Sequence, residues 1–129
     1  MFYYKETLRV ERAALGKNHR DVVLTLLHCG QVMQGQGELH EALDYYQQAL
    51  EAQPKGSDVK PSDYAVSARV LNHMGNIFLQ RGQTKEMVGA LSESLRYFQK
   101  AGKRESELVV SGFNFYALAK RHPEASPVA

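Results

Sequence analysis

The sequence has a single cysteine, Cys29, so no disulfide can form within the chain. A lone cysteine fits a reducing compartment, and we expect a cytoplasmic protein. No apolar run approaches the roughly 20 residues of a membrane-spanning helix. Residues 1–12 are apolar and then charged, the reverse of a signal peptide. We therefore expect no membrane association.

An excess of one charge is also missing. The 16 Lys and Arg residues are balanced by 14 Asp and Glu, which gives a formal net charge of +2, and the basic residues do not form one run. Nucleic-acid binding is therefore not indicated. The chain also lacks a sustained strand-like alternation and the Asn-Gly and Asp-Gly pairs of tight hairpins. These absences favour an all-helical protein.

Helical spacing of apolar residues runs through the chain instead. We expect helices over residues 2–15, 20–34, 37–54, 62–81, 84–101 and 104–121. Stop signals follow four of them, at Gly16, Pro54, Gly82 and Pro123. Ser62 or Asp63 is expected to cap the fourth helix. Short connections between helices predict antiparallel neighbours.

An internal repeat organises these helices. Residues 26–50 align without a gap with residues 71–95, which places Leu26 on Leu71 at a shift of 45 residues. Residues 3–10 match residues 45–52 at a shift of 42. The chain therefore contains the second helix of one pair, two full helix pairs and a further first helix.

Small residues recur at fixed positions of the repeat, where they would allow two helices to pack closely. Gly30 and Gly75 fall inside expected helices, where glycine costs about 1 kcal/mol relative to alanine. Ala42 and Ala49 lie two turns apart on one stripe, and Tyr46 lies between them. Small residues let a partner helix approach closely, and the tyrosine ring fills the remaining space. The pattern therefore predicts stacked helix pairs that complete one another's core.

This repeat resembles the tetratricopeptide repeat, whose pattern runs W-x2-L-G-x2-Y, then A-x3-F, then A and P. The first copy follows it with Leu26, Cys29, Gly30, Met33, Ala42, Tyr46, Ala49 and Pro54. The second copy departs from it, with Met87 where a small residue is usual and no closing proline. The long repeat and the junction LGKNHRDV, residues 15–22, resemble the kinesin-light-chain variety of the family.

The resemblance implies an all-α, right-handed solenoid of about six antiparallel helices. We expect one domain over residues 1–122. It would consist of a partial repeat over 1–17, repeats over 18–59 and 60–102, and a last helix over 103–122. Residues 123–129 would form a tail.

The resemblance also implies that the first helix of each pair lines a concave groove. One stripe of the fourth helix is polar, and its counterpart 45 residues earlier mixes polar and apolar residues. We expect this groove to bind a peptide segment through Leu24, Leu27, His28, Gln31, Arg69, Asn72, His73, Asn76 and Phe115. Asparagine amides can donate to and accept from a peptide backbone, and arginine can pair with a carboxylate. The predicted function is a non-catalytic scaffold or adaptor that binds a partner protein, favouring an acidic segment.

Two alternatives remain open. The first helix has no paired helix before it, so an apolar edge with Phe2, Tyr4 and Leu8 could make the chain a structural, self-associating module that forms homo-oligomers. A helical enzyme is the other alternative, but no catalytic constellation is found. Cys29 falls at a packing position, and His28 and His73 lack further ligands for a metal, so no metal or cofactor is expected.

Overall fold

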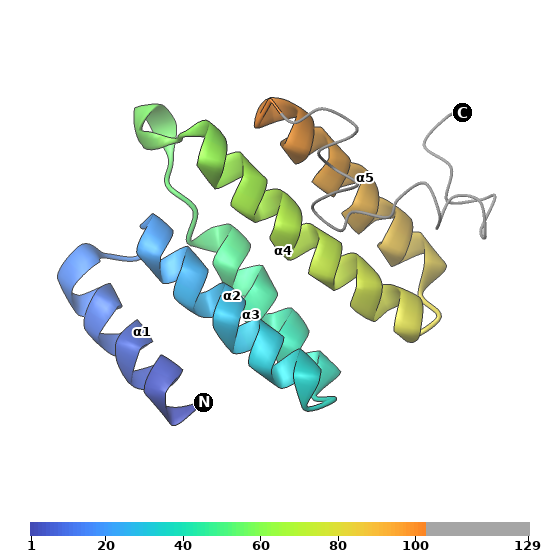
Figure 1. The fold of residues 1–129 in the computed structure, drawn as a ribbon, viewed down its shortest axis with the longest axis horizontal. Coiled ribbons are helices and arrows are strands. Elements are labelled where there is room, and N and C mark those ends of the chain that lie inside the picture. The colour runs from blue at the N-terminus through green and yellow to red at the C-terminus, as the bar shows by residue number, and fades with distance from the viewer. Residues whose placement is uncertain (103–129) are drawn as a thin grey trace.

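The computed structural model describes residues 1–102, which form α-helices, one short 3-10 helix and no strand. The elements are α1 (Phe2–Leu15), α2 (Arg20–Gly35), α3 (Leu39–Glu51), η1 (Gly56–Asp58), α4 (Pro61–Gln80) and α5 (Thr84–Lys100). Figure 1 shows α4 lying between the α2–α3 pair and α5. The predicted all-helical solenoid is confirmed. The expected sixth helix and the tail lie outside the described residues.

Two helix pairs make up most of this part of the chain. α2 packs against α3, α4 packs against α5, and α1 packs on the outer side of α2. α4 contacts both α2 and α3, which joins the two pairs. This arrangement places α1 in the position of a second helix from a preceding pair, as the alignment of residues 3–10 with 45–52 predicts.

The ends of the helices follow local signals, with one difference from expectation. Gly16 ends α1 with φ of 86°, a conformation that favours glycine. The cap of α4 was predicted wrongly: its N-cap is Lys60, and Pro61 is the first helical residue, where its missing N–H is not needed. Asp63 lies inside the first turn, and its Oδ2 accepts a hydrogen bond from the Lys60 backbone N–H at 2.8 Å. Ser62 is exposed.

Glycine sets the closest approach within each pair. A Cβ added to Gly30 would lie 2.6 Å from Cδ1 and 2.9 Å from Cζ of Tyr46, distances that real Cβ atoms do not adopt. A Cβ added to Gly75 would lie 2.7 Å from Cδ2 of Leu91. The two glycines are 45 residues apart, as are Tyr46 and Leu91. The repeat therefore encodes the same close helix contact twice.

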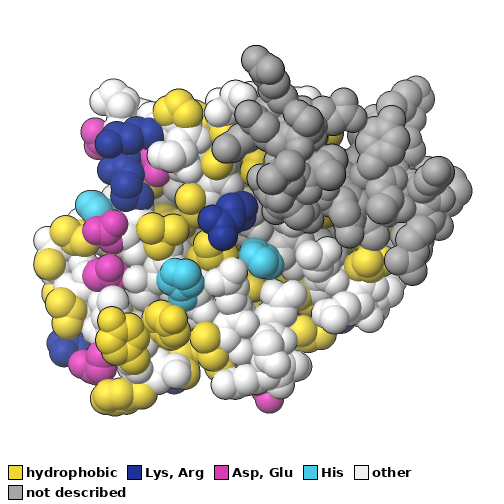
Figure 2. Space-filling view, in the orientation of Figure 1, with side chains coloured by type: hydrophobic (Ala, Val, Ile, Leu, Met, Phe, Trp, Pro, Cys, Tyr) yellow, Lys and Arg dark blue, Asp and Glu magenta, His cyan; other side chains and the backbone are white. Residues whose placement is uncertain are grey.

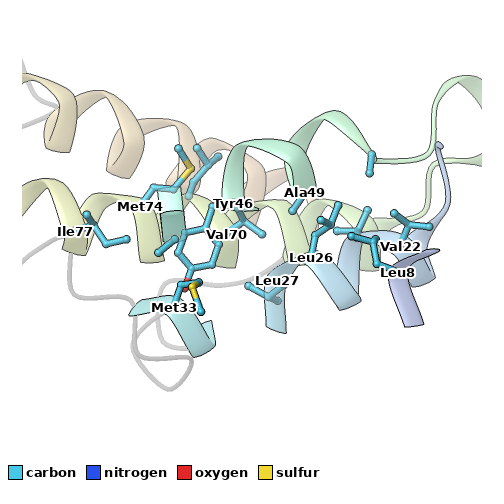
Figure 3. Close-up of a cluster of buried hydrophobic side chains, with 14 residues drawn as sticks. Leu8, Val22, Leu26, Leu27, Met33, Tyr46, Ala49, Val70, Met74 and Ile77 are labelled. Atoms are coloured by element: carbon cyan, nitrogen blue, oxygen red, sulfur yellow. The ribbon is translucent and has the colours of Figure 1, made fainter. Parts of the chain in front are cut away.

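The main core runs continuously from α1 to α4. Figure 3 shows Leu8, Val22, Leu26, Tyr46 and Val70 among its side chains. A second cluster between α4 and α5 contains Ala68, Met87, Leu91 and Phe98. Cys29 is fully buried, as its packing position predicts. Leu8 is buried against α2, so the expected exposed edge of α1 is smaller than the sequence suggested.

A partly buried ion pair joins the first turns of α2 and α4. Arg20 donates from Nε to Oδ1 of Asp63 at 3.2 Å and from a terminal nitrogen to Oδ2 at 3.0 Å. It also donates to the backbone oxygen of Asp58 at 3.0 Å. Burial raises the pKa of Asp63, but the hydrogen bonds from Arg20 and from the Lys60 amide outweigh it and hold the pKa below its usual value. The pair fixes how one repeat begins relative to the next.

The glycine contacts predict opposite effects for two Gly→Ala substitutions. Gly30→Ala should destabilise the fold by about 1–3 kcal/mol, because the new methyl group overlaps the buried Tyr46 ring. Gly89→Ala should stabilise it by about 0.5–1 kcal/mol, because Gly89 is exposed within α5 and nothing lies near its added Cβ. Urea unfolding of both variants measures the difference. Equal effects of the two substitutions would refute the close approach of α2 and α3.

Candidate partner-binding face on α2 and α4

The outer sides of α2 and α4 lie next to each other on one face of the molecule. Figure 2 shows this face, with histidine side chains near its middle, a basic side chain beside them and hydrophobic side chains gathered over α1. We call it the α2–α4 face and define it by Leu24, His28, Gln31, Arg69, Asn72, His73 and Asn76. All seven are exposed or half-buried.

Two of the predicted site residues do not belong to this face. Leu27 is only 1% exposed and lies in the main core, so its side chain cannot contact a ligand. The prediction that Leu27 lines a groove was wrong. Helix α2 is covered by α1, α3 and α4, so a large part of its surface is buried. Phe115 lies outside the described residues.

A row of aromatic rings and one amide crosses the face. The Tyr4 ring stacks on His28 with centroids 5.8 Å apart, and the Tyr46 ring stacks on His73 with centroids 5.5 Å apart. Between the histidines, Gln31 Oε1 lies 3.2 Å from His28 Nδ1, and Gln31 Nε2 lies 3.4 Å from His73 Nε2. The row connects α1, α2 and α4 with the underlying helix α3.

The glutamine amide determines the proton positions on both rings. An amide oxygen can only accept and an amide nitrogen can only donate, so His28 donates through Nδ1 and His73 accepts through Nε2. A protonated His73 has no acceptor nitrogen. Charging this ring would therefore place two donors against each other, unless the Gln31 amide turned over.

The environment of His73 also disfavours its charged form. Burial lowers the pKa of His73, and the positive charge of Arg69 lowers it further. Tyr46, on which the ring stacks, is fully buried and donates its hydroxyl to Gln34 Oε1 at 2.6 Å. At neutral pH, His73 is thus a neutral, partly buried ring.

Polar groups on α4 remain available for a ligand. Within residues 1–102, the side-chain amides of Asn72 and Asn76 have no hydrogen-bond partner. Arg69 is exposed and forms no ion pair within the same residues. Leu24 adds an apolar side chain that is 39% exposed. The face therefore offers donors, acceptors, one free positive charge and one apolar contact.

No group of three or more His, Cys, Asp or Glu side chains is arranged to hold a metal ion in residues 1–102. None of the helices within residues 1–102 has the length and hydropathy of a membrane span.

The family model of the tetratricopeptide repeat matches residues 3–55, which cover α1, α2 and α3. Over these residues the chain is similar to a tetratricopeptide repeat. It is also similar to a protein of the organism Prochlorococcus marinus, "Photosystem I assembly protein Ycf3", with 32% identity over 100 residues. The match covers 78% of this chain and 49% of the relative, so the chain spans about half the relative's length.

The two Tyr–His stacks were not predicted from the sequence. The signal for them was present in the repeat. Tyr4 aligns with Tyr46 at the shift of 42 residues, and His28 aligns with His73 at the shift of 45. Equivalent residues at two successive junctions predict equivalent contacts, and the structure has both.

His73 predicts a loss of stability in mild acid. Its pKa is lower in the folded chain than its ordinary value of 6.5, so below that pH the unfolded chain binds a proton that the folded chain resists. Its contribution to stability is complete above pH 6.5 and is lost as the pH falls through the folded pKa. His73→Gln should therefore flatten the fall in melting temperature between about pH 7 and pH 5. His40→Gln, at an exposed position of α3, is the control. If His73→Gln and the parent lose stability in parallel, another group is responsible.

Proposed function

We propose that this chain is a non-catalytic adaptor that binds an extended segment of a partner protein on the α2–α4 face. Tetratricopeptide repeats generally mediate protein–protein interaction, and the similar protein is named for assembly. The observation that supports this face most directly is the pair of unpartnered amides at Asn72 and Asn76, beside the free Arg69.

The spacing of the two asparagines suits an extended peptide. Four residues along α4 rise about 6 Å, at about 1.5 Å per residue. Two residues of an extended chain advance about 6.6 Å. Asn72 and Asn76 can therefore meet every second peptide group of a segment that runs along α4. Gln31 and His28, on the neighbouring helix, would border the same segment.

The charge of the face favours an acidic segment. Arg69 would pair with a ligand carboxylate, and such an exposed pair weakens as salt is added. Leu24 would contact an apolar side chain of the ligand. The residues proposed to contact the partner segment are thus the seven of the α2–α4 face, without the buried Leu27.

The length of the repeat supports the kinesin-light-chain variety as a further part of this proposal. Gly30 and Gly75 make the same helix contact 45 residues apart, compared with roughly 34 residues in the usual repeat. The added residues lengthen α4 to 20 residues and form the η1 segment before it.

We also propose that residues 1–122 form one domain, with its last helix over 103–122. We further propose a cytoplasmic location, because the one cysteine of the chain is a buried free thiol.

Replacing the two amides tests the α2–α4 face. Asn72→Ala with Asn76→Ala should weaken binding of a partner recovered from cell extract by roughly 1–3 kcal/mol, because the peptide groups would lose desolvated hydrogen bonds. The fold should persist, since neither side chain is buried. Calorimetric titration gives the affinity.

The matched control is Gln47→Ala with Glu51→Ala, which alters polar side chains on the outside of α3. This variant should bind as the parent does. If it abolishes binding while the Asn72/Asn76 variant binds normally, the partner docks on the other side of the molecule and the proposal is wrong.

Self-association through α1 is a second candidate function, and the exposure of that helix supports it. Phe2 is 79% exposed, Tyr3 is 73% exposed and Val10 is 54% exposed. Tyr3 and Val10 are seven residues apart, so they lie on one stripe of α1. Three large apolar side chains along one helix make a surface that a second copy could cover.

Sedimentation velocity tests this second candidate. The average mass of the parent chain should rise with concentration, and Tyr3→Glu with Val10→Glu should remove the rise, since charged side chains would oppose burial. A parent chain that stays monomeric at millimolar concentration would exclude self-association.

A further inference from the structure

A hollow of about 280 Å³ lies away from the α2–α4 face. It is formed where the end of α3 and the loop after it meet α4 and α5. Its apolar wall consists of Leu50, Pro54 and Val59. No residue of the α2–α4 face lines it.

One polar group in this hollow lacks a partner. Gln53 lines it, and the side-chain nitrogen of Gln53 is buried without a hydrogen-bond partner in the described part of the chain. The Gln53 backbone oxygen is already held by Asn18, which donates to it at 3.2 Å. A buried N–H without an acceptor is unfavourable, so a ligand that brings an acceptor to this point would be stabilised.

Two tyrosines also line the hollow. The rings of Tyr64 on α4 and Tyr97 on α5 stack with centroids 6.0 Å apart, and both line the hollow. The Lys100 ammonium lies 5.6 Å from each centroid. An aromatic or aliphatic group in the hollow would therefore contact tyrosine rings and apolar side chains, with the Lys100 ammonium close to the same rings.

The charges around the hollow leave a positive excess. Two carboxylates line it, and both are paired: Asp63 binds Arg20, and Glu93 lies 3.3 Å from Arg96. Lys55 lines the hollow and Lys100 lies over its tyrosines, and neither forms an ion pair within residues 1–102. A ligand that carries negative charge would complement them.

The size of the hollow indicates what it can hold. A cavity of about 150 Å³ holds benzene, and sites for drug-sized molecules begin near roughly 300 Å³. The observed 280 Å³ fits one large side chain and part of its backbone.

We propose that the hollow binds an apolar side chain of a partner protein carried on an acidic segment. Gln53 would donate to a backbone carbonyl of that segment, and Lys55 and Lys100 would face its carboxylates.

A peptide with this chemistry tests the site directly. The probe is acetyl-Glu-Asp-Phe-Asp-Glu-amide, titrated into the isotopically labelled full chain and followed by NMR. Amide signals of residues 53, 55–59 and 97–100 should shift with one common affinity. Probes with alanine in place of phenylalanine, or with lysines in place of the acids, should bind about tenfold more weakly or not at all. If the phenylalanine probe gives no shifts, the proposal is overturned.

Further variants distinguish binding of the probe in the hollow from non-specific electrostatic attraction of the acidic probe. Lys55→Glu with Lys100→Glu should weaken probe binding by about tenfold. Arg81→Glu with Lys85→Glu makes the same change of charge at exposed positions in the turn before α5 and in its first turn, and it should have little effect. Val59→Phe should fill the hollow and prevent binding while the melting temperature stays near that of the parent. Equal weakening by both charge reversals would overturn the proposal.

The α2–α4 face supplies the last control, because this inference does not depend on the proposed function. Asn72→Ala with Asn76→Ala should leave probe binding unchanged. If this variant prevents probe binding while the Lys55/Lys100 variant binds normally, the probe lies on the α2–α4 face. That result would overturn the second site and support the first.

Discussion

The contact between Gly30 and the Tyr46 ring is the constraint on which the rest of the described structure depends. The ring fills the space that a Cβ would occupy, so it fixes how closely α2 and α3 approach. The same ring is fully buried, donates to Gln34 and supports His73 of the next pair by stacking. One side chain thus sets the packing within a pair and the position of a residue on the α2–α4 face.

The repeat made most of this arrangement predictable, because packing within a helix pair is local in sequence. Gly30, Tyr46 and their equivalents Gly75 and Leu91 were recognisable from alignment alone, and the structure places each pair in contact. Alignment failed for Leu27, which aligns with the half-buried Asn72 but is itself buried. Leu27 is apolar and packs in the main core, whereas the aligned Asn72 is polar, so alignment matched the two positions without matching their burial.

Features formed between distant segments could not be predicted from the sequence. The ion pair of Arg20 with Asp63 spans 43 residues, and the hollow depends on how the loop after α3 lies against Tyr64 and Tyr97. Neither belongs to the repeated pattern, since Arg20, Asp63 and residues 53–60 all lie outside the aligned segments. The cap of α4 was missed for a related reason: the carboxylate of Asp63 both closes the first turn and binds Arg20. Local preference alone could not show that one side chain does both.

The two Tyr–His stacks show that the repeat carries surface chemistry as well as packing. Each stack joins the second helix of one pair to the first helix of the next, and Gln31 links the two histidines. His28 is exposed beside the outermost helix, whereas His73 is half-buried against the fully buried Tyr46. The two aligned histidines therefore differ in burial, because they stack on tyrosines of different helices. Because Gln31 in its observed orientation donates to His73 only while that ring is neutral, the hydrogen bonding on the α2–α4 face depends on the packing around His73. A ligand that orders Gln31 would stabilise the junction between the two helix pairs, and a change that loosens the junction would weaken binding on the α2–α4 face.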